Sequence, residues 1–171
     1  GELADDSSAA SLDNADEEVA KLIDWLKKHP EKADAYSWGK LDSYRWRILL
    51  QKCPKYARYC DWSKLDGDNW SRLLRRQPRF ADKCDWSKLD ATGWKDLLDW
   101  QQQFMEKCDL AEIFKTAAGK EFKADRYDDV GGMGDLVSEY PKLSDKCDWG
   151  KLNEEVLSQL RIGDWEELIG I

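Results

Sequence analysis

Few residues of this chain are of the types that catalyse reactions or bind metal ions, and their spacing assembles no reactive site. His29 is the only histidine among the 171 residues and stands directly before Pro30. Histidine-based catalysis needs partner residues at a suitable spacing, and we expect His29 instead to interact with carbonyl groups at a helix end. Asp128 and Asp129 lack the spaced ligands of a calcium loop. The sequence therefore favours a non-enzymatic protein with no cofactor and no metal.

The five cysteines are the remaining candidates for chemistry, and four of them recur at one position, namely Cys60, Cys84, Cys108 and Cys147. Equivalent residues of neighbouring helical repeats lie roughly 8–10 Å apart, whereas a disulfide needs Cα atoms within about 7 Å. We therefore expect a ladder of small, buried, free thiols. Free thiols slightly favour the cytoplasm, and export with a removed signal peptide stays open as the alternative.

The cysteines belong to a repeat with a period of 24 residues. The motif Cys-Asp-Trp-Ser-Lys-Leu-Asp of residues 60–66 recurs at 84–90, and weaker copies occupy 36–42, 108–114 and 147–153. One such unit cannot bury its apolar face alone, so a fixed period indicates units stacked on one another. We predict an all-α, right-handed solenoid of about five to six repeats with one inserted loop.

Within each repeat, apolar residues recur at the spacing of one helix face. The three columns are Leu22, Trp46, Trp70 and Trp94; Trp25, Leu49, Leu73 and Leu97; and Leu26, Leu50, Leu74 and Leu98. Each of the three complete repeats has an aspartate just before the helix, suited to cap its N-terminus. These aspartates are Asp42, Asp66 and Asp90.

Proline is expected to end each helix, because the residue before a proline disfavours helical geometry. Pro54 and Pro78 should then start short helical turns over residues 54–59 and 78–83. The Asp-Trp-Ser-Lys-Leu stretch is too short for an α-helix and predicts a 3₁₀ turn. In the fourth repeat Gln102 replaces the proline, so that helix is expected to continue into Phe104.

The chain is expected to form one folded domain. Residues 1–14 are rich in Asp, Ser and Ala without periodicity, which predicts a disordered acidic lead-in. Residues 15–171 form the single helical-repeat domain, with a repeat insertion at 115–132. The pattern resumes at Leu136 and Val137, in register with Cys147, so the insertion is expected to leave the array intact.

A helix with paired leucines, a following proline and a tight turn resembles the leucine-rich-variant class of short helical solenoids. The resemblance covers about residues 19–171 and implies a solenoid fold without implying a function. The metal-cluster segment of that class has no counterpart, because no cysteines cluster in the N-terminal part. Tryptophan in the repeat core is a second departure.

Tryptophan is the compositional outlier, with ten copies. One column holds Trp46, Trp70 and Trp94, and another holds Trp38, Trp62, Trp86 and Trp149. Both columns could be stacking platforms for sugars or bases, but the helix face shared with leucine favours a buried structural ladder. Trp100 lies outside both columns and is the better candidate for exposure.

Charge is distributed unevenly along this acidic chain, whose net charge is −8. Residues 45–79 hold ten Lys or Arg against three Asp or Glu, whereas residues 1–36 hold four against ten. The basic band could dock an acidic partner, a phosphate-bearing ligand or nucleic acid. Its alternative is an ordinary solvated helix face covered by the acidic N-terminus.

We therefore predict a helical-repeat scaffold for protein–protein interaction, with an acidic protein partner. The candidate partner-binding residues are Arg72, Arg75, Arg76, Arg79, Trp100, Lys120 and Arg126. The alternative is a ligand-recognition module that binds carbohydrate through exposed tryptophan or nucleic acid through residues 45–79. The net negative charge disfavours nucleic acid, and no apolar run is long enough for a membrane span. The oligomeric state stays open.

Overall fold

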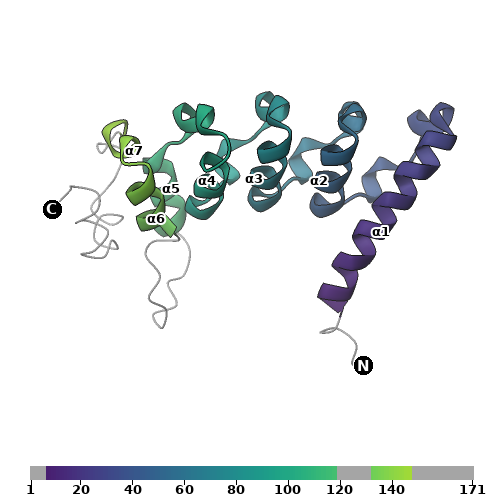
Figure 1. Cartoon of the computed structure of the whole chain (residues 1–171), viewed down its shortest axis with the longest axis horizontal. Helices are drawn as coiled ribbons and strands as arrows, with labels where there is room; N and C mark the ends of the chain where they lie inside the picture. Colours follow the sequence, from purple (N-terminus) through teal and green to yellow (C-terminus); the bar gives the residue numbers. More distant parts are fainter. Residues whose placement is uncertain (1–6, 119–131, 148–171) are drawn as a thin grey trace. The chain divides into compact units, whose positions relative to one another are not determined.

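The structure is a computed structural model that describes residues 7–118 and 132–147, with side chains for 14–114 and 132–147. Over these residues the chain is helical and contains no β-strand, which confirms the all-α prediction. The chain divides into two compact units, Gly1–Lys83 and Cys84–Ile171. Each unit is described by itself below, and Figure 1 labels the helices of both.

Unit 1 alternates α-helices with short 3₁₀ segments. The elements are α1 (Ser7–Lys28), η1 (Pro30–Ala35), η2 (Trp38–Lys40), α2 (Ser43–Lys52), η3 (Pro54–Tyr59), η4 (Trp62–Lys64), α3 (Gly67–Arg76) and η5 (Pro78–Lys83). Helix α1 packs against α2, and α2 packs against α3. Successive repeats of this unit therefore lie side by side, as the 24-residue period predicts.

Unit 2 begins in the same way and then departs from the pattern. Its elements are η6 (Trp86–Lys88), α4 (Ala91–Leu98), η7 (Gln102–Lys107), α5 (Leu110–Ala118), α6 (Met133–Glu139) and α7 (Lys142–Asp145). Helix α6 packs against α4, so it takes the position of the next repeat helix after the insertion.

The capping aspartates are confirmed as the starts of the repeat helices. The carboxylate of Asp42 accepts the Arg45 N–H at 2.9 Å, Asp66 accepts the Asn69 N–H at 2.9 Å, and Asp90 accepts the Gly93 N–H at 2.7 Å. Each bond satisfies one of the N–H groups that a helix start leaves without an intrahelical partner.

One backbone conformation recurs directly before each six-residue 3₁₀ segment, whether or not that segment starts with proline. The φ and ψ angles are −137° and 75° at Cys53, −129° and 68° at Gln77, and −135° and 71° at Gln101. The expectation that Gln102 lets the fourth helix continue is therefore wrong, because a 3₁₀ segment starts there as it does at Pro54 and Pro78. Phe104 is buried against Trp86, with ring centroids 5.4 Å apart, and this packing requires the turn.

The tryptophan column of the repeat helices forms the core, as predicted. Trp46, Trp70 and Trp94 are at most 1% exposed, and the leucines of the two neighbouring columns are buried with them. The tryptophans of the 3₁₀ turns differ, because Trp38, Trp62 and Trp86 are only half-buried. Each stacks with one face on the core tryptophan of its repeat, at centroid distances of 5.6, 5.5 and 5.2 Å.

The predicted boundaries at the lead-in and at the insertion need correction. Helix α1 starts at Ser7, inside the segment 1–14 for which the sequence predicts disorder, because a helix nucleated by the apolar pattern from Ala15 onward gains one hydrogen bond for each residue by which it extends. The copy at 108–114 is an α-helix rather than a 3₁₀ turn, and this helix, α5, runs on to Ala118 within the expected loop 115–132. Its start is capped by Asp109, which accepts the Ala111 N–H at 3.1 Å.

Gly132 marks the return from the insertion to the repeat pattern. Its φ of +85° lies in the left-handed region, which side chains rarely adopt. A Cβ at this position would also lie 2.6 Å from Thr92 Oγ1. Glycine therefore lets the chain approach α4 closely just before α6 begins. The rest of the insertion and residues 148–171, which include Trp149 and Trp165, lie outside the described residues.

Candidate functional site

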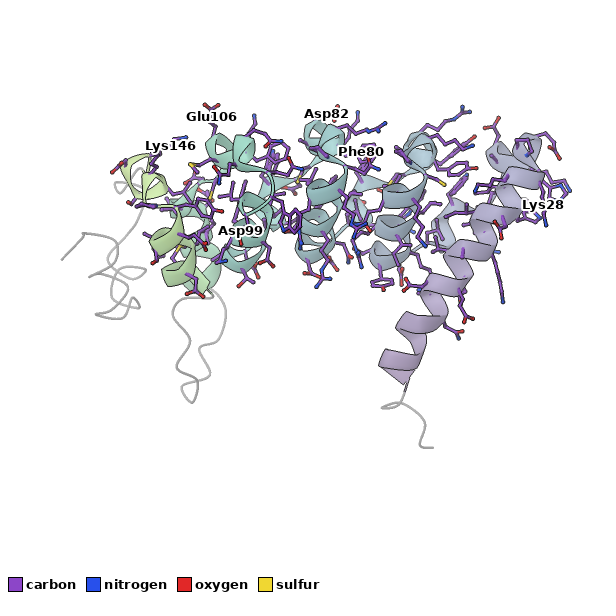
Figure 2. All side chains as sticks on the ribbon, viewed as in Figure 1. Lys28, Phe80, Asp82, Asp99, Glu106 and Lys146 are labelled. Atoms are coloured by element: carbon purple, nitrogen blue, oxygen red, sulfur yellow. The ribbon has the colours of Figure 1, made fainter. Side chains whose placement is uncertain are left out.

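Six exposed cations gather at one edge of unit 1, at the C-terminal ends of α2 and α3 and along η3 and η5. We call this set the basic edge, and it consists of Lys52, Lys55, Arg58, Arg76, Arg79 and Lys83. The 3₁₀ segments lie at one end of the helices in Figure 1. Figure 2 shows Asp82, the acidic residue of η5, at the outer end of that segment.

Most of these cations have no counter-charge in the described part of the chain. Arg58 pairs with Asp34 at 3.0 Å, and the Lys55 ammonium lies 5.1 Å from the ring centroid of Tyr56. Four of the six have neither an ion-pair partner nor an aromatic contact among the described residues. These four are Lys52, Arg76, Arg79 and Lys83.

The predicted partner-binding residues do not form one set. Arg76 and Arg79 belong to the basic edge, whereas the Arg72 Nε is 3.2 Å from Asp68 on its own helix. Arg75 is half-buried, with interactions inside the protein. Trp100 is 67% exposed, as expected, but belongs to unit 2. Lys120 and Arg126 lie outside the described residues.

The acidic N-terminal helix contacts a different part of the basic band. Arg45 Nε lies 2.8 Å from Glu18 of α1 and Arg45 Nη1 lies 2.7 Å from Asp42, and Tyr44 donates to Asp16 at 3.3 Å. The hydrogen bond with Glu18 raises the pKa of Arg45 above its usual value. Asp16 and Glu18 of α1 thus contact the start of α2, whereas the basic edge stays exposed.

A groove of about 420 Å³ opens beside the basic edge, between the end of η3, η4 and η5. We call it the Trp62 groove. Its apolar lining consists of Ala57, Cys60, Trp62 and Phe80, and its charged lining consists of Arg58, Arg79, Asp82 and Lys83. Pockets that bind ligands have this character, with apolar surface and a few polar groups around it. Three of the four charged residues are cations of the basic edge.

The equivalent place one repeat earlier is occupied by the protein itself. Tyr59 stacks on Trp38 with centroids 4.6 Å apart and planes 9° from parallel. The hydroxyl of Tyr59 donates a hydrogen bond to the Asp34 carboxylate, which lowers the pKa of Asp34 and raises the pKa of Tyr59. Trp38 is held in place by its indole N–H, which donates to the Ala33 carbonyl at 2.9 Å.

Unit 2 has a smaller groove of about 190 Å³ with a different charge. Trp86 and Lys107 line it, in the repeat positions of Trp62 and Lys83, together with the acidic residues Asp109 and Glu112. Its mixed rim lacks the arginines of the Trp62 groove. Anionic groups are therefore attracted to the groove of unit 1 more strongly than to this one.

All five cysteines are free thiols, as expected, although only Cys108 is buried and the others are half-buried. Burial raises the pKa of Cys60, Cys84 and Cys108 to about 12 each. A thiol with such a pKa is not a nucleophile near neutral pH. His29 packs against Trp25, with centroids 5.3 Å apart, and its backbone N–H bonds the Trp25 carbonyl. Among the described residues no group of three or more His, Cys, Asp or Glu side chains could hold a metal ion.

Sequence reasoning missed four members of the basic edge and the Trp62 groove. Lys52 and Lys55 stand 24 residues before Arg76 and Arg79, so the repeat register alone would have placed them at the same edge. The change from Tyr59 to Lys83 at one repeat position was also visible. That this change leaves a groove beside Trp62 follows only from the stacking of Tyr59 on Trp38, which the sequence does not show.

Comparisons with known proteins add no identity to this geometry. No family model matches the chain, and neither curated proteins nor solved structures gave a significant match. Over the described residues, the helices are too short or too polar to cross a bilayer.

Proposed function

We propose that this protein is a non-enzymatic helical-repeat scaffold that binds an acidic protein partner through the basic edge of unit 1. The observation that carries the proposal is the group of four exposed cations that have neither an ion pair nor an aromatic contact in the described structure, on a protein whose net charge is −8. An array of like charges at one edge repels itself, and an acidic partner relieves that repulsion. Complementary charge of this kind speeds association and selects the partner.

An ordinary structural role accounts for part of the edge only. Cations in the last turn of a helix interact favourably with the helix dipole, and this explains Lys52 and Arg76. Arg79 and Lys83 lie beyond the helix end, in η5, where that benefit has faded. Their exposure and their lack of ion pairs in the described structure favour a role in binding.

We also propose that the chain folds as a right-handed solenoid of about five to six repeats. The 24-residue period and the packing of neighbouring helices inside each unit support it. Small-angle X-ray scattering tests it, because a globular chain of this length has a radius of gyration of about 16 Å. A solenoid gives a clearly larger value, and a value near that of a globular chain would contradict the proposal.

The alternative function is recognition of a smaller ligand through exposed aromatic surface. Trp100 is the observation that favours it, because two thirds of this large apolar side chain face solvent at 67% exposure. Tryptophan exposed in this way stacks on sugars or bases. A carbohydrate or nucleic-acid ligand would then depend on Trp100 or on residues 45–79 as a whole.

Binding of a labelled poly-glutamate peptide, followed by fluorescence anisotropy at several salt concentrations, separates these functions. The test variant reverses the charge at Arg76, Arg79 and Lys83 to Glu. The control variant makes the same net change at Lys21, Lys40 and Lys142, which are exposed and without ion pairs in the described structure. We expect the test variant to bind more slowly and with a flatter salt dependence than the parent, and the control to resemble the parent. Equal loss in both variants, or tighter binding of a single-stranded oligonucleotide, would refute the proposal.

A further inference from the structure

The Trp62 groove and the equivalent place one repeat earlier are lined by corresponding backbone positions, but different side chains occupy those positions. Each lining position of the groove has an equivalent 24 residues earlier, so that Trp62 corresponds to Trp38 and Lys83 to Tyr59. In the earlier repeat Trp38 lies between two rings. Trp46 stacks on it at 5.6 Å and Tyr59 at 4.6 Å. Trp38, Trp46 and Tyr59 therefore form a stack of three rings, and Tyr36 adds an edge contact to Trp38 at 4.9 Å.

In the later repeat the stack is one ring shorter, and Cys60 replaces Tyr36, which contacts Trp38 edge-on. Trp62 stacks on Trp70 at 5.5 Å, but the position of Tyr59 is held by Lys83, whose side chain is not aromatic. The groove of about 420 Å³ opens at this place, with Trp62 and Phe80 in its lining. A tyrosine ring therefore has the size and shape to stack on Trp62, because Tyr59 occupies the equivalent space beside Trp38.

The charge of the groove indicates which groups should lie next to the aromatic ring of a bound guest. In the earlier repeat the acceptor for the Tyr59 hydroxyl is the carboxylate of Asp34. The equivalent position in the later repeat is Arg58, a donor with a positive charge. Arg79 and Lys83 add two more cations to the lining. A guest in this groove is therefore expected to carry carboxylates close to its ring.

We propose that the Trp62 groove binds an aromatic side chain of an acidic segment in the partner protein, with the ring stacked on Trp62 in the place that Tyr59 takes on Trp38. The flanking Asp or Glu carboxylates pair with Arg58, Arg79 and Lys83. This inference rests on the proposed function and names the segment that the basic edge selects. A peptide is favoured over a nucleotide because the ring that fills the equivalent space one repeat earlier is an amino-acid side chain, that of Tyr59.

The test compares two labelled acidic peptides that differ in one residue, a central Tyr in one and Ala in the other, by fluorescence anisotropy. Two variants at the exposed Lys83 accompany the parent. Lys83→Tyr supplies the missing ring from the protein itself, and Lys83→Gln removes the same charge without filling the groove. Because Lys83 is exposed, both variants are expected to fold. The preference for the Tyr peptide over the Ala peptide can also be measured on the parent protein alone.

The expected result is that the parent binds the Tyr peptide at least about tenfold more tightly than the Ala peptide. Lys83→Tyr should remove this preference, and Lys83→Gln should keep it while weakening both peptides. If the parent binds both peptides equally and the Arg76, Arg79 and Lys83 reversal weakens them equally, the aromatic site is refuted and the proposed function stands. If neither peptide binds, both fail. Displacement of the Tyr peptide by a single-stranded oligonucleotide that binds more tightly would overturn the inference in favour of nucleic acid.

Discussion

The third and fourth repeats, one in each unit, have the same core and the same local backbone. Trp70 and Trp94 are both buried and lie at equivalent positions. Asp66 and Asp90 cap their helices with the same hydrogen bond. Both helices are followed by a six-residue 3₁₀ segment. These shared features are the ones that stacking demands.

The edges of the same two repeats differ at two exposed positions that carry arginine in the third repeat, whereas Lys83 recurs as Lys107. Arg76 is replaced by Trp100, and Arg79 is replaced by Gln103. Glu106 lies at the outer end of η7 (Figure 2), in the repeat position of Asp82. The comparison teaches that the core keeps the fold while the edge is free to vary, so binding specificity is expected at the edge.

Replacement of a core tryptophan is expected to have the largest effect. Trp70→Ala should lower the free energy of unfolding by about 3–5 kcal/mol, because it empties space in a packed core. Trp100→Ala, at the variable edge, should change it by less than about 0.5 kcal/mol. Urea denaturation measures both.

A second change at the same core position sharpens this result. Trp70→Phe keeps an aromatic ring and removes an indole N–H that is buried and has no acceptor among the described residues. It should therefore cost less than Trp70→Ala. Equal, small losses for Trp70→Ala and Trp100→Ala would break the distinction between core and edge.

Alkaline pH should destabilise the protein through groups that the fold keeps neutral. Burial raises the pKa of Cys108 from 9.0 to about 12, and burial with the Asp99 hydrogen bond raises that of Tyr140 from 10.0 to about 12. These protonated groups therefore make their full contribution to the free energy of unfolding below about pH 9, and this contribution is lost as the pH rises toward 12. The reason is that the unfolded chain releases these protons at a lower pH than the folded chain does. Thermal melting from about pH 8 upward measures the loss. Tyr140→Phe should reduce it, and an unchanged melting temperature up to about pH 11 would contradict the assignment.

Loss of a helix cap should have a smaller effect. Asp66→Ala removes the acceptor for both the backbone and side-chain N–H groups of Asn69, each at 2.9 Å. The expected cost is about 1 kcal/mol. Asp68→Ala on the same helix breaks only the exposed pair with Arg72 and should cost about 0.3–0.5 kcal/mol. Chemical denaturation compares the two, and a larger cost for Asp68→Ala would show that the cap is unimportant.

The sequence predicted those features that depend on local chemistry and periodicity. An aspartate before an apolar run, a proline at a fixed place and a column of tryptophans each have a direct physical consequence, and the structure confirms each of them. The prediction that the helix continues through Gln102 is wrong because proline is not the only cause of the turn: the packing of Phe104 against Trp86 favours it as well. The Trp62 groove depends on which ring faces Trp62 across two segments, and a single sequence does not contain that geometry.

The indole N–H signals of the ten tryptophans in a ¹⁵N-labelled sample test the central claim most directly. The signals are assigned through single Trp→Phe substitutions, and the acidic Tyr peptide is then titrated into the parent protein. Binding at the basic edge of unit 1 should shift the signal of Trp62 strongly and leave that of Trp100 unchanged. A shift at Trp100 with none at Trp62 would place the binding surface elsewhere and contradict the account.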